Sequence, residues 1–263
     1  MGPSELNRVC ILIRDGYRIA VEIGEPSVIY LETIRRHSVA EGKYIRQTGG
    51  LGNYGHVKIQ MEPTEEGKGI EFTNRVQDGQ IPTRYIPSIE SGIREALQGG
   101  VLAGYKIVDT KVTLFDGSYH SEDSNEMAFR IAASMAFKDA ARKANPVILE
   151  PVMAVEVLVP AKYVDAVIDD LSRRRGRIES IDAETLAQTI RAKAPLAEML
   201  YYSAQLDALT DGWGQGTMEF VRYEVASRPD QADGDEAGVT AKRPSGPKPP
   251  RDAATASLDP EFE

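Results

Sequence analysis

The sequence predicts an α+β protein with two domains and a C-terminal tail that has no fold of its own. The last structured region has the strand and helix order βαββαβ, which is the ferredoxin-like pattern. The region before it mixes strands and helices less regularly, and the end of the chain contains few large apolar residues. A length of 263 residues suits two cores, since domains commonly have roughly 100–150 residues.

The ferredoxin-like region is predicted from apolar runs and periodicity. An apolar run rich in β-branched residues ends at Pro160 and indicates a strand, and the segment after it has apolar side chains on one helical face. A second helix is expected after Pro195. The expected strands are residues 152–159, 177–183, 184–194 and 216–223, and the expected helices are residues 162–174 and 196–209.

The central region predicts four strands and two helices. Ser121 or Ser124 is the expected N-cap of the longer helix, with Asp123 or Glu126 nearby. This cap would hold His120 near a helix N-terminus. The expected strands are residues 43–46, 57–61, 70–75 and 107–114, and the expected helices are residues 87–98 and 124–144.

The two ends of the chain have different compositions. Before the central region we expect a helix at residues 6–14 and short strands at residues 17–22 and 27–31. From residue 227 to 263 the chain is rich in Ala, Asp, Pro, Gly, Lys and Arg. Such a segment buries too little apolar surface to offset its conformational entropy, so we expect a disordered tail.

Charge and composition exclude several protein classes. The net charge of −9 does not favour general binding of polyanions, so any RNA contact must use local basic clusters. No apolar run approaches the roughly 20 residues of a membrane span, and the N-terminus does not resemble a secretory signal. The single Cys10 excludes an internal disulfide, which predicts a cytoplasmic protein.

The densest basic cluster is Arg173, Arg174 and Arg175, and it has two interpretations. Cations at a helix C-terminus complement the helix dipole, and Gly176 would then supply a left-handed C-cap. Alternatively, the three arginines bind RNA. Lys138, Arg142 and Lys143 form a second basic set at helical spacing, and Arg35 and Arg36 form a third.

Known catalytic and cofactor motifs are not supported. Residues 50–55 match the dinucleotide pattern G-x-G-x-x-G, but the residues after them alternate as a strand, whereas that motif must open a helix. There is no phosphate-binding loop of the G-x-x-x-x-G-K-[ST] type. The three histidines lack the spacing and partners of a zinc site. We therefore expect no cofactor, metal or catalytic residues.

His120 has three interpretations. It is a histidine satisfied within a capped turn, a binding residue, or a general base beside Glu122 and Asp123. The last defines the alternative function, in which the chain is a repurposed α/β enzyme or small-ligand binder with a cleft beside His120.

Two polar segments, residues 49–56 and 117–124, resemble the tip loops of the fourth domain of bacterial elongation factor G, the translocase of the ribosome. Leu51 replaces an arginine of the family pattern, and Asn53 replaces a glutamine. The resemblance runs from about Tyr17 to Tyr223. Further matching segments are Gly104-Tyr105, residues 132–138, Leu149-Glu150-Pro151, residues 170–176 and residues 217–220.

The resemblance implies a domain organisation. Residues 32–150 would be the family's fourth domain, a ribosomal-protein-S5-like α/β fold, and residues 151–226 its ferredoxin-like fifth domain. Residues 1–31 would be a remnant of the third domain, and residues 227–263 would be the disordered tail.

The resemblance also implies function and partners. The tip loops would enter the decoding region of the ribosome during tRNA–mRNA translocation, contacting ribosomal RNA, tRNA and mRNA. The family's GTPase domain has no counterpart here, so the chain would not be an enzyme and would act either with a separate GTPase-bearing chain or as a vestigial or regulatory piece. The implied RNA-binding residues are Gly50, Gly52, Asn53, Tyr54, His56, Ser118, Tyr119 and His120 in the tip loops and Arg173, Arg174 and Arg175 in the basic cluster.

Overall fold

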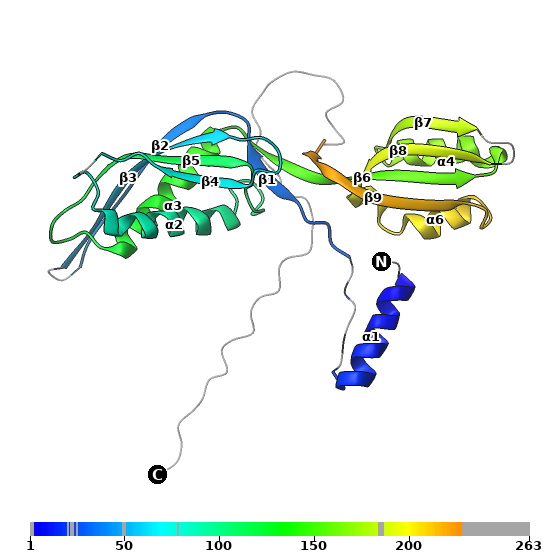
Figure 1. Cartoon of the computed structure of the whole chain (residues 1–263), viewed down its shortest axis with the longest axis horizontal. Helices are drawn as coiled ribbons and strands as arrows, with labels where there is room; N and C mark the ends of the chain where they lie inside the picture. Colours follow the sequence, from blue (N-terminus) through cyan, green and yellow to red (C-terminus); the bar gives the residue numbers. More distant parts are fainter. Residues whose placement is uncertain are drawn as a thin grey trace, which may run out of the picture.

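The computed structural model describes residues 3–19, 21, 24, 26–48, 51–77, 79–183 and 187–227. The predicted disordered tail therefore lies almost wholly outside the described residues. Figure 1 shows two units of mixed helix and sheet, joined by the long strand β6 (Pro146–Val159). This arrangement confirms the predicted α+β class.

The first unit is a four-stranded sheet covered by two helices. Its strand order is β2-β3-β5-β4, with β4 parallel to β5 and the other neighbours antiparallel. The helices α2 and α3 lie along one face of the sheet (Figure 1). The elements are β2 (Ser38–Thr48), β3 (Leu51–Pro63), β4 (Ile70–Asn74), the 3-10 turn η1 (Thr83–Tyr85), α2 (Ile86–Gln98), β5 (Thr110–Ser118) and α3 (Glu126–Lys143).

The core of the first unit follows from strand alternation and small helical residues. Val57, Ile59 and Met61 alternate along β3 and are fully buried. Helix α3 presents a row of buried alanines, which lets the sheet approach closely. At Gly42 of β2, a Cβ atom would lie 2.0 Å from the carbonyl oxygen of Ala132, so only glycine fits there.

The second unit has the predicted ferredoxin-like topology. Its sheet is antiparallel with order β9-β6-β8-β7, and therefore the four strands are arranged 4-1-3-2 in chain order. A separate hydrophobic core includes Val157, Val167, Leu171 and Ile190. The further elements are the 3-10 turn η2 (Ala161–Tyr163), α4 (Val164–Arg173), β7 (Arg177–Ala183), β8 (Gln188–Pro195), α5 (Leu196–Met199), α6 (Tyr202–Leu209) and β9 (Gln215–Val225).

Three of the expected elements are wrong, the helix at residues 196–209 and the strands at residues 17–22 and 27–31. The single helix predicted at residues 196–209 is divided into α5 and α6, because Tyr201 adopts a left-handed conformation with φ of 63°. In the N-terminal segment, α1 (Pro3–Tyr17) extends to Tyr17, and the described residues of 18–30 form no strand. The first strand is instead β1 (Leu31–Ile34).

Strand β6 connects the two units: it forms one five-stranded sheet with β1, β7, β8 and β9, and the four-stranded sheet of the first unit does not include it. Its first residues pair with β1, in the register Leu31 to Leu149, and its later residues pair with β8 and β9. The predicted domain boundary at residues 150 and 151 falls inside this strand and stays a prediction. Backbone pairing thus runs without a break from β1 into the ferredoxin-like sheet.

A buried carboxylate fixes the loop after α2. Glu32 of β1 is fully buried, and its two carboxylate oxygens accept hydrogen bonds from five consecutive backbone N–H groups, those of Val101 to Tyr105, at 2.6–3.1 Å. Such bonds to a charged acceptor are stronger than neutral ones. Gly100 and Gly104 have positive φ, which lets the loop wrap around the carboxylate.

Candidate nucleic-acid interface

The two predicted tip segments lie side by side at one end of the first unit. The backbone N–H of Tyr54 donates to the carbonyl oxygen of Asp123 at 2.8 Å, and Ser124 Oγ donates to the carbonyl of Tyr54 at 2.9 Å. Figure 1 shows the β2–β3 hairpin at the end of this unit that points away from the second unit. The expected convergence of the two segments is therefore observed.

Glycines in the first segment permit close backbone approach. A Cβ atom on Gly52 would lie 2.4 Å from the Asp123 carboxylate, and one on Gly55 would lie 2.5 Å from the backbone of Ala128 in α3. These glycines therefore serve packing between hairpin and helix. Gly50 lies outside the described residues.

Asp123 and Asn125 connect the two segments. Asp123 Oδ1 accepts a hydrogen bond from the Gly52 N–H at 3.1 Å. Asn125 Nδ2 donates to Asn53 Oδ1 at 2.7 Å, while Asn125 Oδ1 accepts from the Ala128 N–H. Asn53 Nδ2 makes no hydrogen bond to the described residues, so the amide can offer its N–H donors to a ligand.

The observed N-cap of α3 differs from the one predicted from the sequence. The cap is Asn125, whose side chain accepts from Ala128 N–H at 2.9 Å, and not Ser121 or Ser124. Ser124 instead accepts from the His120 N–H at 2.9 Å and bonds across to Tyr54. The helix thus starts later because Ser124 closes the loop.

His120 projects from this loop, and contacts at Nδ1 hold its ring in place. Its side chain is 53% exposed, and Nδ1 lies 3.2 Å from both the Asp123 N–H and Asp123 Oδ2. Nε2 makes no hydrogen bond to the part of the chain that the structure describes. The neighbouring Tyr119 is also exposed. The ring therefore presents Nε2 to an approaching ligand.

Tyr54, His56 and Ser118 bond to one another instead. Ser118 Oγ lies 2.7 Å from the Tyr54 hydroxyl and 2.8 Å from His56 Nδ1, and His56 Nε2 lies 3.5 Å from Glu41 Oε1. Burial lowers the pKa of His56 more than the nearby Glu41 raises it, so the ring is neutral at pH 7. These three side chains stiffen the strands beneath the loops.

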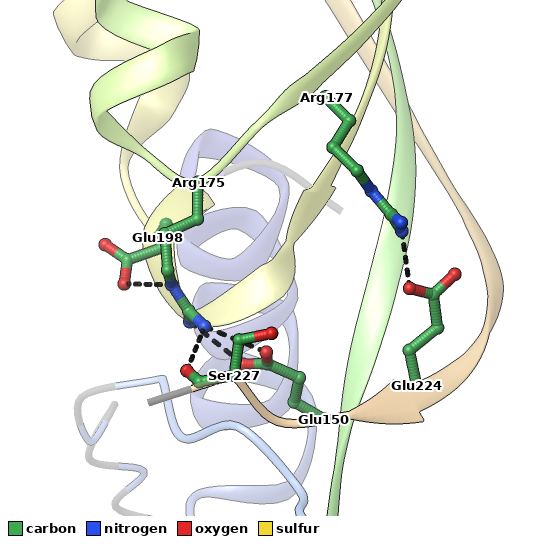
Figure 2. Close-up of polar contacts among 6 residues, drawn as sticks. All are labelled: Glu150, Arg175, Arg177, Glu198, Glu224 and Ser227. Carbon is green, nitrogen blue, oxygen red and sulfur yellow. Dashed lines mark hydrogen bonds and ion pairs between the residues drawn. The ribbon is translucent and has the colours of Figure 1, made fainter. Parts of the chain in front are cut away.

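The basic cluster lies in the second unit, where Arg174 and Arg175 have partners within the chain. Arg174 Nε donates to Asp170 at 2.7 Å, and its guanidinium stacks over the ring of Tyr202 at 5.1 Å. Arg175 forms two hydrogen bonds of 2.9 Å to the Glu150 carboxylate (Figure 2). Arg173 is exposed and has no hydrogen bond to any described residue.

Arg175 is the centre of this ion-pair group, and Glu150 is its most buried partner. The Glu150 side chain is only 6% exposed, and the bonds from Arg175 raise the pKa of that guanidinium. Figure 2 shows Arg175 also reaching Glu198 and the carbonyl of Ser227, while Arg177 pairs separately with Glu224. Arg175 therefore ties the end of α4 to β6 and to the end of β9.

The predicted left-handed cap at Gly176 is wrong by one residue. Arg175 has the positive φ, of 58°, and the Gly176 N–H donates to the Leu171 carbonyl at 2.8 Å. This is a Schellman motif with Arg175 at the left-handed position. Glycine is still required at 176, because a Cβ atom would lie 2.6 Å from that carbonyl.

The described residues give little support to metal binding or to a reaction in a cleft beside His120. No group of three or more His, Cys, Asp or Glu side chains among them is placed to hold a metal ion. Two surface cavities, one beside α2 and α3 and one beside β1 and β9, are not lined by His120. No helix in the described ranges is long and apolar enough to cross a membrane.

Comparison with known proteins gives matches over both units. The family model "Elongation factor G, domain IV" matches residues 26–145, and "Elongation factor G C-terminus" matches residues 147–233. A crystal structure of a Thermus thermophilus protein is 41% identical, with a TM-score of 0.70, over 87% of this chain and 34% of that one. The chain thus spans about a third of the length of that protein.

Proposed function

The chain belongs to the elongation factor G family, and we propose that it is a ribosome-binding module of translation whose tip loops enter the decoding region during tRNA–mRNA translocation. The observation that carries the proposal is the joined tip. Asp123 and Asn125 hold the two loops as one projecting unit, and His120 is exposed at its surface. A preorganised unit loses little conformational entropy on binding.

The tip residues have different roles in this proposal. His120 and Tyr119 contact RNA directly, by a hydrogen bond from the imidazole and by stacking of the phenol ring. Asn53 donates to an acceptor on a base, ribose or phosphate. Gly52 allows the close approach of the two loops, and the remaining described residues, Tyr54, His56 and Ser118, form the network that supports it.

Only one arginine of the basic cluster contacts RNA in this proposal. Because Arg174 and Arg175 are engaged by Asp170 and Glu150, we assign the RNA contact of the cluster to Arg173. Partner recognition is thereby divided between the two units, with the tip in one and Arg173 in the other.

We also propose that this module does no catalysis itself. GTP hydrolysis is then supplied from outside the two matched regions, by a GTPase-bearing part or a separate chain. The expected partners are ribosomal RNA, tRNA and mRNA in the decoding region.

The tip is tested by a double substitution, Asn53→Ala with His120→Ala. His120 is exposed, and Asn53 is half-buried and loses its hydrogen bond from Asn125, so the free energy of unfolding should fall by about 1–2 kcal/mol. In a chimera that carries the GTPase and intermediate domains of a complete factor, translocation should slow by about tenfold or more, since each lost contact contributes on the order of 1 kcal/mol. GTP hydrolysis should be unchanged.

The matched control is His37→Ala, which removes an exposed histidine of the first unit between β1 and β2. It should leave both rates unchanged. Equal translocation rates for the double variant and the parent chimera would remove Asn53 and His120 from the functional site.

A further inference from the structure

A polar cavity of about 350 Å³ lies between the C-terminal ends of α2 and α3. It is lined by the loop Gly99–Gly104, by Glu95 and Ala96 of α2, and by Lys138 and Arg142 of α3. None of these residues belongs to the tip or to the basic cluster. The cavity is therefore separate from the site described above.

Lys138 and Arg142 are the two unpaired cations of α3. They stand four residues apart and so share one face of the helix. Both are exposed, and neither has a hydrogen bond or ion pair to the described residues. The other two cations of the helix are already ion-paired, Arg130 with Glu95 and Lys143 with Asp139. In a protein of net charge −9, these two unpaired cations of α3 both line the cavity.

The opposite wall is a rigid loop that presents acceptors. Glu32 holds the N–H groups of Val101 to Tyr105 from the inside. The carbonyl groups of Gly99–Gly104 accept no hydrogen bond within the described part of the chain. A Cβ atom on Gly100 would lie 2.2 Å from the Tyr105 carbonyl, so the loop is tightly packed. Its shape is set before any ligand arrives.

The two walls require a ligand with both acceptors and donors. A phosphate group fits between Lys138 and Arg142, while the carbonyl groups require hydroxyl or amino donors. A ribose 2′-hydroxyl is such a donor, and it lies next to a phosphate in every RNA strand. Leu102, which is 37% exposed on the loop, adds an apolar contact for a sugar or base.

We propose that this cavity binds a ribose–phosphate segment of RNA, giving the first unit a second RNA contact besides its tip. On the ribosome the segment belongs to ribosomal RNA, and this assignment of the source rests on the proposed function. Lys138 and Arg142 bind the phosphate. The carbonyl groups of the glycine-rich loop bind the 2′-hydroxyl of the same strand.

The test uses the full chain and a fluorescein-labelled RNA hairpin of about 20 nucleotides, with binding followed by anisotropy over a series of KCl concentrations. The variant Lys138→Gln/Arg142→Gln should bind about tenfold more weakly at low salt. The slope of log affinity against log salt should become shallower by about 0.7–0.9, because the contact with one phosphate is lost. The control Lys68→Gln/Lys143→Gln removes two exposed cations that are ion-paired with Glu65 and Asp139, and should resemble the parent.

Equal losses in the two double variants would overturn the proposal, as would a parent chain that does not bind the hairpin at low salt. A hairpin of the same sequence made of DNA should bind the parent more weakly, because it lacks the 2′-hydroxyl; equal affinity would contradict the role given to the carbonyl groups. Cosedimentation with ribosomes is measured alongside. A parent that binds the hairpin through Lys138 and Arg142 but not ribosomes refutes the proposed function and leaves this site standing.

Discussion

Glu32→Gln is expected to lower the free energy of unfolding by about 3 kcal/mol or more, since at least two hydrogen bonds to a charged acceptor are lost and each contributes roughly 1.5–3 kcal/mol. Glu32 Oε2 accepts from Val101 and Leu102, and Oε1 accepts from the next three N–H groups. A glutamine keeps one oxygen and turns an NH₂ group toward the other set of donors. Those donors are then buried without acceptors.

Urea unfolding followed by circular dichroism measures this loss. The control is Glu71→Gln, which changes an exposed glutamate on β4 of the same unit and should alter the free energy of unfolding by less than about 0.5 kcal/mol. If the two variants unfold at the same urea concentration, the Glu32 carboxylate does not hold the loop after α2.

Arg175→Gln is expected to cost about 3 kcal/mol, at the lower end of the range for breaking a buried ion pair. Glu150 is nearly fully buried and would lose both of its bonds of 2.9 Å to the guanidinium. Arg175 itself keeps some contact with water, so the loss is smaller than for a wholly enclosed pair. The ferredoxin-like unit should therefore melt at a clearly lower temperature.

The adjacent Arg173→Gln is the matched control, because it removes the same charge from the same helix end without a partner in the described chain. Its melting temperature should equal that of the parent. Its affinity for ribosomes should fall, with a salt dependence shallower by about 0.7–0.9. If the affinity for ribosomes is unchanged, the three arginines of the cluster have only a structural role.

Regular elements could be predicted from the sequence because their patterns are local. The strand expected at residues 177–183 is β7, and the helix expected at residues 87–98 is α2 with one more residue at its start. Alternation of period two and an apolar helical face are visible in a short window. The βαββαβ order then determined the topology of the second unit.

The buried carboxylates could not be predicted in the same way. Glu32 and Glu150 lie in apolar runs, where an isolated glutamate gives no sign of burial, and their partners are 69 to 73 and 25 residues away in the sequence. The same distance effect explains Arg175, whose partner Glu150 is 25 residues away, whereas Arg174 pairs with Asp170 only four residues before it. Their type and spacing indicate a basic surface, but contacts made only in the folded chain engage both side chains.

The position of the tip was predicted from the sequence, but the residues that join its two loops were not. The sequence identified both loops and placed Asp123 near the expected cap and beside His120, but it gave no role to Asn125 and did not indicate that these two residues join the loops. Three candidate caps stand within five residues, Ser121, Ser124 and Asn125. Which of them ends the loop depends on the bond from Ser124 to Tyr54 on another strand.

The central claim is that this tip reaches the decoding region of the ribosome. Its most direct measurement is hydroxyl-radical probing from an iron chelate attached to Glu122→Cys, in a chain with Cys10→Ser, bound to ribosomes. Glu122 is exposed on the loop that carries His120. A second chelate at Trp213→Cys, exposed in the other unit, is the reference. We predict cleavage of small-subunit RNA around the decoding region from residue 122 and a different cleavage pattern from residue 213. No cleavage of that RNA from residue 122, with ribosomes bound, would contradict the account.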